Sequence, residues 1–163
     1  DYSSQMIKRA KTKAIECGIP VEQIHCADAQ ALPFQHEKFD KLFFPLSLGS
    51  IPEPHRALME AERVLAPHGQ IALFEKLIDD GHRPSPGRRC ANFFTQCIFA
   101  DINRNLTMML GGEAASLKIV AYDSMAGQLK GCFAGHVDRY YRVAVLVRKT
   151  EYPDRPSLQA MTR

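Results

Sequence analysis

The stretch "HCADAQALPF", residues 25–34, contains the side chain best placed for ligand chemistry. Asp28 ends a short apolar run and is followed directly by Ala-Gln-Ala-Leu-Pro-Phe. An ionised carboxylate accepts hydrogen bonds and donates none, so it suits a ligand that presents N–H or O–H groups. The pattern predicts a strand that ends in a ligand-facing carboxylate and leads into an apolar pocket wall. The alternative is that Asp28 only caps the turn that follows it.

The segments around Asp28 alternate between helical and extended patterns. Residues 3–17 carry apolar side chains at helical spacing, with a serine at the start and Gly18 as the stop, so we expect a helix there. Residues 21–28 are expected to form a short strand ending near Asp28. Residues 39–47 are a nearly continuous apolar run, which predicts a strand buried on both faces.

The pattern continues in the second half of the chain. Residues 52–69 open with prolines and close at Gly69, which predicts a helix, and residues 70–77 predict the next buried strand. A polar loop then leads to residues 90–110, which are apolar at helical spacing. Residues 117–125 and 139–149 are two further strand candidates, rich in valine and tyrosine.

Strands that alternate with helices predict an α/β fold with a Rossmann-like sheet. We expect helices on both faces of the sheet and an antiparallel edge strand, because no helix separates the last two strands. Residues 1–150 are expected to form one partial domain, and residues 151–163 a loose C-terminal tail.

Composition narrows the class of protein. The chain has 163 residues, 45% of them hydrophobic, and a formal net charge of +3, with no aromatic residues interleaved among its basic clusters. Nucleic-acid binding is therefore not expected, and neither is a transmembrane segment, since no apolar run is long enough. The five cysteines are odd in number and form no CxxC, which favours reduced thiols, a cytoplasmic location and no metal site.

Two longer motifs carry a family resemblance. "ADAQALPFQHEKFDKLFF" followed by "IPEPHRALMEAERVLAPHGQIALFE" resembles the central half of a class I S-adenosylmethionine-dependent methyltransferase. The closest group contains the ubiquinone and menaquinone methyltransferases and related small-molecule and lipid enzymes. His68 stands where that family has the first glycine of the turn before its fifth strand. The resemblance covers residues 1–77 well and the remainder only by the order of elements.

The resemblance implies S-adenosylmethionine as the cofactor, with S-adenosylhomocysteine as the product, and assigns roles to particular residues. Asp28 accepts a hydrogen bond from the adenine amino group, the Ala29 amide donates to a ring nitrogen, and Leu32 lines the adenine together with Phe34. An acid at the end of the second strand clasps the ribose hydroxyls, a role that "DYSSQMIKRA" gives to Asp1.

Four more residues complete the expected cofactor site. Tyr2 or Met6 lines the adenosine, while Pro45 and Leu46 lie near the methionine end of the cofactor. Asp1 has an alternative role as an ordinary helix-initiating residue.

The glycine-rich loop that carries the cofactor's carboxypropyl group in this family is missing from the sequence. The first strand and first helix of the family are missing too, and that strand lies in the middle of the sheet. We therefore expect the chain to be an incomplete domain that needs a strand-helix-strand unit upstream.

The function implied is methyl transfer from the sulfonium to a small-molecule or lipid-like acceptor. The catalytic residues stay unknown; Glu75, Asp79 and His82 are candidates for a general base, each with the alternative of a solvent-facing loop residue. Residues 83–110 are expected to form a substrate lid, with a basic face of Arg83, Arg88 and Arg89 and an apolar face that includes Phe93, Phe94, Ile98 and Phe99. This pairing suits an amphiphilic acceptor or a peripheral membrane contact, and the alternative is a helix that packs against the sheet. The oligomeric state is unknown.

Two other classes of function remain. A non-catalytic module that kept the fold for binding or interaction is favoured by the missing glycine loop if the protein starts at Asp1, whereas Asp28 and the Leu-Pro-Phe segment argue against it. A nucleotide-dependent oxidoreductase is disfavoured, because its glycine-rich fingerprint is absent as well.

Overall fold

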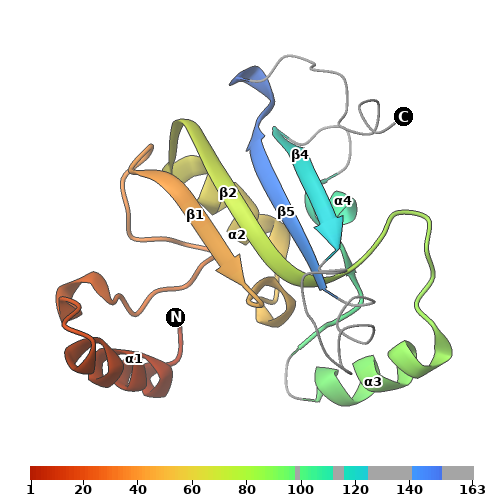
Figure 1. The fold of residues 1–163 in the computed structure, drawn as a ribbon, viewed down its shortest axis with the longest axis horizontal. Helices are drawn as coiled ribbons and strands as arrows, with labels where there is room; N and C mark the ends of the chain where they lie inside the picture. The colour runs from red at the N-terminus through yellow and green to blue at the C-terminus, as the bar shows by residue number, and fades with distance from the viewer. Residues whose placement is uncertain (98–99, 112–115, 125–140, 152–163) are drawn as a thin grey trace.

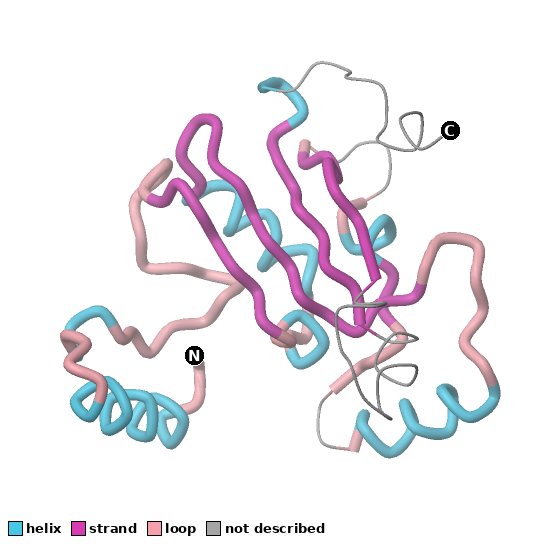
Figure 2. The backbone as a smooth tube through the Cα atoms, in the orientation of Figure 1, coloured by secondary structure: helices cyan, strands magenta, loops and turns pink. Residues whose placement is uncertain are grey.

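The structure is a computed structural model that describes residues 1–97, 100–111, 116–124 and 141–151 (Figure 1). Figure 2 shows how its helices and strands follow one another along the chain. The elements in chain order are α1 (Ser4–Glu16), η1 (Val21–Gln23), β1 (Phe39–Pro45), η2 (Leu48–Ser50), α2 (Pro54–Val64), β2 (Leu65–Ile78), α3 (Pro86–Gln96), β3 (Arg104–Asn105), α4 (Leu106–Met109), β4 (Leu117–Ser124), β5 (Tyr141–Arg148) and η4 (Lys149–Glu151).

The sheet has the strand order β1-β2-β5-β4, and the short β3 pairs with the end of β2. β1 and β2 are parallel, whereas β5 is antiparallel to both of its neighbours. The predicted Rossmann-like α/β fold is therefore confirmed, with an antiparallel pair of strands at one edge. The strand that runs in the opposite direction is β5, which lies between β2 and β4, and β4 is the strand at that edge of the described sheet.

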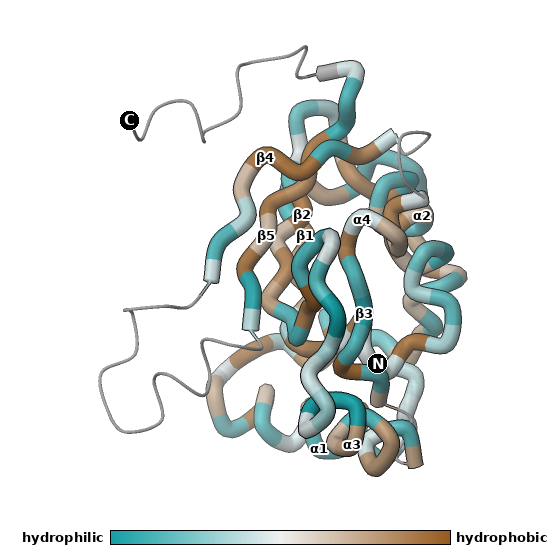
Figure 3. The backbone as a smooth tube through the Cα atoms, turned by 90° about the vertical axis from the view of Figure 1, so that its right-hand side faces the viewer, coloured by the Kyte–Doolittle hydropathy of each residue, from teal (hydrophilic) through white to brown (hydrophobic). Residues whose placement is uncertain are grey.

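The core lies between the sheet and α2. The buried side of α2 presents Ala57, Leu58, Ala61 and Val64, which follow the helical repeat. Alternate residues of β2 face this helix, and Ile71, Leu73 and Leu77 are therefore buried. Figure 1 shows α2 and α4 on the same face of the sheet, and Figure 3 shows hydrophobic backbone positions concentrated along the strands.

β1 is a strand as expected, but the prediction that it is buried on both faces is wrong. Leu42 and Phe44 are half-buried toward the core, whereas the side chain of Phe43 is 62% exposed. The physical reason is the position of β1: it pairs with β2 on one side and forms the rim of the described sheet (Figure 1).

The boundary between α2 and β2 differs from the prediction. The helix predicted to close at Gly69 ends at Val64, because Pro67 cannot continue a helix and the chain is already extended at Leu65. β2 therefore begins at Leu65 rather than at residue 70. His68 in this stretch has φ 61°, a left-handed conformation that explains why glycine suits the same turn in the related family.

The expected strand at residues 21–28 is only partly present. Val21–Gln23 form the 3-10 turn η1, which follows Pro20, and the extended residues after it form no regular strand. The helix predicted at residues 3–17 is confirmed as α1. It is capped by Ser3, whose hydroxyl accepts from the Met6 amide at 3.4 Å.

Candidate cofactor site

The first residues of the chain lie beside the segment that ends at Asp28. The Asp1 nitrogen donates to the His25 carbonyl (3.4 Å), and the Ala27 amide donates to the Asp1 carbonyl (3.1 Å). Asp1 thus bonds to the residues on both sides of Cys26, which is the hydrogen-bond pattern of two parallel strands. Because parallel segments end on the same side, this pairing brings Asp1 and Asp28 to one edge of the molecule.

The carboxylate of Asp28 caps a turn and also has a charge available for a ligand. Its Oδ1 accepts from the Gln30 amide (2.8 Å) and from the Gln30 side chain (3.1 Å). These bonds, the backbone amide first, hold the pKa of Asp28 below its usual value, so the group is ionised at neutral pH. The turn-capping alternative is thus realised, and the remaining lone pairs of the carboxylate can still accept from a ligand.

Asp1 uses its carboxylate in a similar way. Oδ1 accepts from the Ser3 amide at 2.8 Å, and among the described residues no hydrogen bond involves Oδ2. Asp1 therefore accepts a hydrogen bond from Ser3, the residue that caps α1. An unengaged oxygen on an exposed carboxylate also suits the ribose clasp. Tyr2 and Met6 are 80% and 47% exposed, so neither side chain is buried within the protein.

The Leu-Pro-Phe loop after Asp28 is held on α2 by a charged pair. Arg63 donates to the carbonyls of Leu32 (2.9 Å) and Phe34 (2.8 Å), and it forms a two-pronged ion pair with Glu60. Glu60 in turn accepts from the Leu32 amide at 2.8 Å. The guanidinium of Arg63 lowers the pKa of Glu60, so both charges are present at neutral pH.

The sequence analysis missed the roles of Glu60 and Arg63, although both lie in the quoted helix motif. An Arg three residues after a Glu on a helix gives only an ion-pair signal, and the carbonyls that it bonds are about 30 positions away. Phe34 contacts the rings of His25 and Phe39 at centroid distances of 5.2 and 5.0 Å, so part of its surface serves packing.

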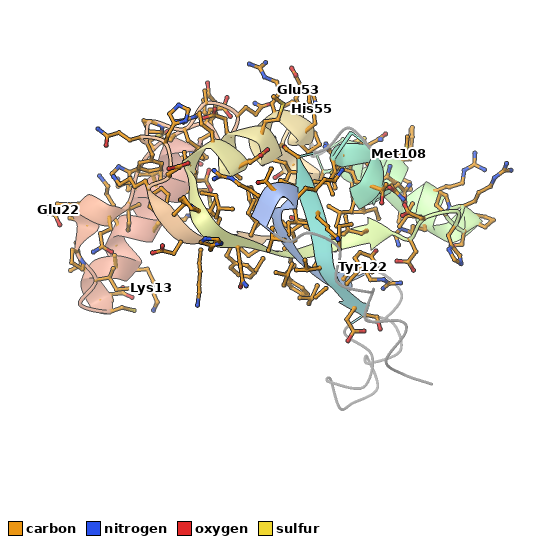
Figure 4. The ribbon with its side chains drawn as sticks, turned by 90° about the horizontal axis from the view of Figure 1, so that it is seen from above. Lys13, Glu22, Glu53, His55, Met108 and Tyr122 are labelled. Carbon is orange, nitrogen blue, oxygen red and sulfur yellow. The ribbon has the colours of Figure 1, made fainter. Side chains whose placement is uncertain are left out.

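The loop after β1 approaches the Asp28 turn through a side-chain bridge. The Glu53 amide at the start of α2 donates to Oε1 of Gln30 at 3.0 Å (Figure 4 shows where Glu53 lies). β1 ends at Pro45, and Leu46, which follows it, has φ 53°, an uncommon conformation for a residue other than glycine. This hydrogen bond connects the turn at Asp28 to the start of α2, at the far end of the segment that follows β1.

The three base candidates lie near or beyond the end of β2, and they differ in exposure and in their hydrogen-bond partners. Glu75 is 3% exposed and accepts from the Leu48 amide at 2.6 Å, so it faces the interior rather than a substrate. Asp79 receives two hydrogen bonds from Arg142 (2.9 and 2.8 Å) and one from Tyr122 (2.7 Å). These contacts, with Arg142 first, lower the pKa of Asp79 and make it a poor proton acceptor. His82 is exposed, and Nδ1 lies 3.2 Å from the Asp80 carbonyl.

The predicted lid corresponds to α3, β3 and α4, and its basic face needs a correction. Arg88 was expected on that face with Arg83 and Arg89, but it is only 6% exposed. Its guanidinium donates to the Leu77 carbonyl (3.1 Å), to Oδ1 of Asn103 (3.1 Å) and to the Ile102 carbonyl. Through these hydrogen bonds the buried Arg88 connects α3 to the end of β2. Ile98 and Phe99, two other residues of the predicted lid, lie outside the described residues.

A cavity of about 240 Å³ lies away from these residues, along α2. It is closed by α4 and the start of β4, and Leu58, Met59, Met109 and Leu117 are among its lining residues. Figure 4 shows His55, which also lines it, on the face of the sheet opposite Tyr122. The predicted cofactor residues do not line this cavity.

Within the part of the chain that the structure describes, no three His, Cys, Asp or Glu side chains form a group that could hold a metal ion. No helix in that part is long and apolar enough to cross a membrane. Four cysteines are free, and Cys132 lies outside the described residues.

Comparison with known proteins identifies the class to which this fold belongs. Residues 1–73 match the family model described as "Methyltransferase domain". The resemblance to class I S-adenosylmethionine-dependent methyltransferases is thereby confirmed, and the fold of the chain is the one that this class uses.

Two relatives show where the similarity lies. The chain is 32% identical over 81 residues to a phosphatidylethanolamine N-methyltransferase of Cereibacter sphaeroides, which covers 49% of this chain and 40% of the relative. It is 34% identical over 76 residues to the ubiquinone/menaquinone biosynthesis C-methyltransferase UbiE of Rickettsia massiliae, covering 46% and 31% respectively. The chain thus matches less than half the length of either relative.

Solved structures share the fold at low sequence identity. A SAM-dependent methyltransferase from Aquifex aeolicus superposes with a TM-score of 0.57 at 16% identity, over 90% of this chain and 66% of that one. A geranyl diphosphate methyltransferase in complex with SAM gives 0.67 at 11% identity, over 90% and 66%. The [4+2]-cyclase SpnF gives 0.65 at 21% identity, over 90% and 64%.

Proposed function

We propose that this chain forms part of an S-adenosylmethionine-dependent methyltransferase that acts on a small-molecule or lipid-like acceptor. The observation that carries the proposal is the parallel pairing of Asp1 with the segment ending at Asp28. This pairing aligns the backbones that carry the two acids, and Gln30 links the Asp28 turn to the start of α2, which supports a shared site.

The residues at this edge fit the chemistry of the cofactor. The ribose hydroxyls and the adenine amino group are donors, and both carboxylates keep acceptor capacity beyond their own turns. Asp1 would bind the ribose, Asp28 and the Ala29 amide the adenine, and Leu32 its apolar face. Tyr2 and Met6 would cover the adenosine, and Pro45 and Leu46 would lie along the methionine part.

When bound, S-adenosylmethionine supplies a methyl group already activated on a sulfonium. The contribution of the chain is therefore alignment of the acceptor and exclusion of water. Arg63 and Glu60 would hold the wall formed by residues 32–34 in place. The 3-10 turn η2 would form part of a second wall. A base is needed only if the acceptor must lose a proton, and of the three candidates His82 is the one left exposed.

Two observations support a lipid-like acceptor. The two relatives described above are named for phosphatidylethanolamine and for ubiquinone and menaquinone. On α3, Phe93 and Phe94 are 67% and 65% exposed, and Arg89 beside them is exposed as well. Aromatic and basic side chains on one exposed helix suit the interface of a membrane or the surface of an amphiphile. We place the protein in the cytoplasm, in peripheral contact with a membrane, and treat residues 1–150 as its partial methyltransferase domain.

A methyl-transfer assay tests the acceptor. The full chain is incubated with S-adenosylmethionine labelled on its methyl group and with vesicles that contain either phosphatidylethanolamine or a reduced quinone. The label is then counted in the organic extract. We expect label in one of the two lipids, and less of it with Asp28→Ala. Label in neither lipid, despite cofactor binding, would contradict the lipid acceptor.

One specific observation favours a second candidate, a module that keeps the fold without methyl transfer. SpnF shares the fold at a TM-score of 0.65 and is described as a cyclase, so this architecture also serves other chemistry. The two functions differ in one measurement: the alternative predicts no turnover of the labelled cofactor with any acceptor.

A further inference from the structure

Glu75 is a buried acid that the proposed chemistry does not use. It lies in β2, 3% exposed, with its side chain on the face that packs against α2. Burying a carboxylate is costly unless hydrogen bonds compensate for the lost water. Burial raises the pKa of Glu75, and backbone amides of the loop after β1 oppose that rise: the Leu48 amide donates to the carboxyl group at 2.6 Å, and Ser47 and Gly49 act in the same direction. Successive backbone amides that converge on one anion form a binding nest.

The loop held by this carboxylate is strained and tightly surrounded. Leu46 has φ 53°, and its amide donates to the Phe74 carbonyl at 2.7 Å. Gly49 lies against the backbone at Asp101: its carbonyl accepts from the Asp101 amide at 2.9 Å, and an added Cβ would come within 2.9 Å of the Asp101 carbonyl oxygen. A strained backbone of this kind persists only where its surroundings determine it fully, and such segments cluster at functional sites.

From these contacts we infer that Glu75 is a positioning residue, whose carboxylate holds residues 46–50 in the conformation that receives the methionine end of the cofactor. The inference rests on the proposed function, because it assigns a purpose to a loop at the proposed site. It also explains why β2 has an acid at a position where its neighbours on the same face are Leu73 and Leu77. A leucine at position 75 would suit the core and would leave the Leu48 amide of the loop without its acceptor.

Two independent readouts on the full chain test this inference. Hydrogen exchange of the amides of residues 47–49 is measured without ligand, and the Kd of S-adenosylhomocysteine is measured by calorimetry. Glu75→Leu removes the acceptor, whereas Glu75→Gln keeps one acceptor oxygen and should retain part of the effect. Gly49→Ala disturbs the same loop without altering a buried charge, and it serves if Glu75→Leu does not fold. Glu62→Gln is the matched control, because Glu62 lies in α2 and bonds the Ser116 hydroxyl instead.

We expect exchange at residues 47–49 at least tenfold faster in Glu75→Leu, with an intermediate value in Glu75→Gln and no change in Glu62→Gln. The Kd should rise at least tenfold in Glu75→Leu and in Gly49→Ala. Asp28→Ala should raise the Kd without changing exchange in this loop. Unchanged exchange in Glu75→Leu, or faster exchange with an unchanged Kd, would overturn the inference. Failure of the wild-type chain to bind would instead contradict the proposed function, and exchange alone would then decide whether Glu75 holds the loop.

Discussion

Replacement of Arg88 by methionine should destabilise the protein far more than the same change at its neighbour Arg89. Arg88 is buried and donates to the Leu77 and Ile102 carbonyls and to the Asn103 amide oxygen, whereas Arg89 is exposed. A hydrogen bond to a charged group contributes about 1.5–3 kcal/mol net, and three acceptors lose their donor. Methionine fills much of the volume and returns about 1–2 kcal/mol through apolar burial and relief of charge desolvation. We therefore expect Arg88→Met to lower the free energy of unfolding by about 3 kcal/mol or more.

The measurement is urea unfolding followed by far-UV circular dichroism, because the chain contains no tryptophan to report by fluorescence. Arg89→Met is the control and should change the free energy of unfolding by less than about 0.5 kcal/mol. Amide exchange within α3 tells whether the helix detaches locally before the sheet unfolds. A difference below about 1 kcal/mol between the two variants, with α3 equally protected in both, would refute the anchoring role given to Arg88.

Three further predictions concern Arg63, Glu60 and His68. Arg63→Met should speed amide exchange of residues 32–34 and weaken S-adenosylhomocysteine binding. Arg56→Met, which removes an exposed ion pair at 3.6 Å on the same helix, should do neither, and equal behaviour of the two would contradict the clamp. The pKa of Glu60 is lowered in the folded protein, so its stabilising contribution is present above about pH 4.5 and is lost as the pH falls further. Unfolding measured between pH 6 and pH 3 should therefore show a smaller loss of stability in Glu60→Gln than in wild type, and parallel curves would argue against it. His68→Gly should raise the free energy of unfolding by about 0.5–1 kcal/mol, because φ at this position is 61° and glycine adopts that conformation without strain. His68→Ala keeps the strain and should give no gain. A gain in both variants would mean that the backbone conformation is not the cause.

The order of elements could be predicted from the sequence because each pattern is local. Apolar spacing predicted α1, β1, α2, β2, β4 and β5, and the absence of a helix between the last two strands indicated the antiparallel pair. The exposure of β1 could not be predicted in this way, since an apolar run shows that a strand can be buried and not which neighbours it has. The same limit applies to residues 21–28, which were predicted as a strand, whereas Val21–Gln23 form a 3-10 turn after Pro20.

The site was partly predictable for the same reason. Asp28 and Asp1 stand at recognisable positions in quoted motifs, and the structure brings them to one edge. Arg63 and Glu75 act through backbone groups 27 or more positions away, and no local spacing encodes such contacts. Arg88 illustrates the opposite error: one arginine of a basic run is buried, and only the fold decides which one.

The central claim is that the edge formed by Asp1, Asp28 and the loop after β1 binds the cofactor. Calorimetric titration with S-adenosylhomocysteine tests it most directly, using the protein with its natural flanking residues, Asp28→Ala, and Asp40→Ala as an exposed acid on β1 for control. The account predicts binding by wild type and by Asp40→Ala, and a Kd at least tenfold higher for Asp28→Ala. Absence of binding by wild type, or an equal Kd in all three proteins, would contradict it.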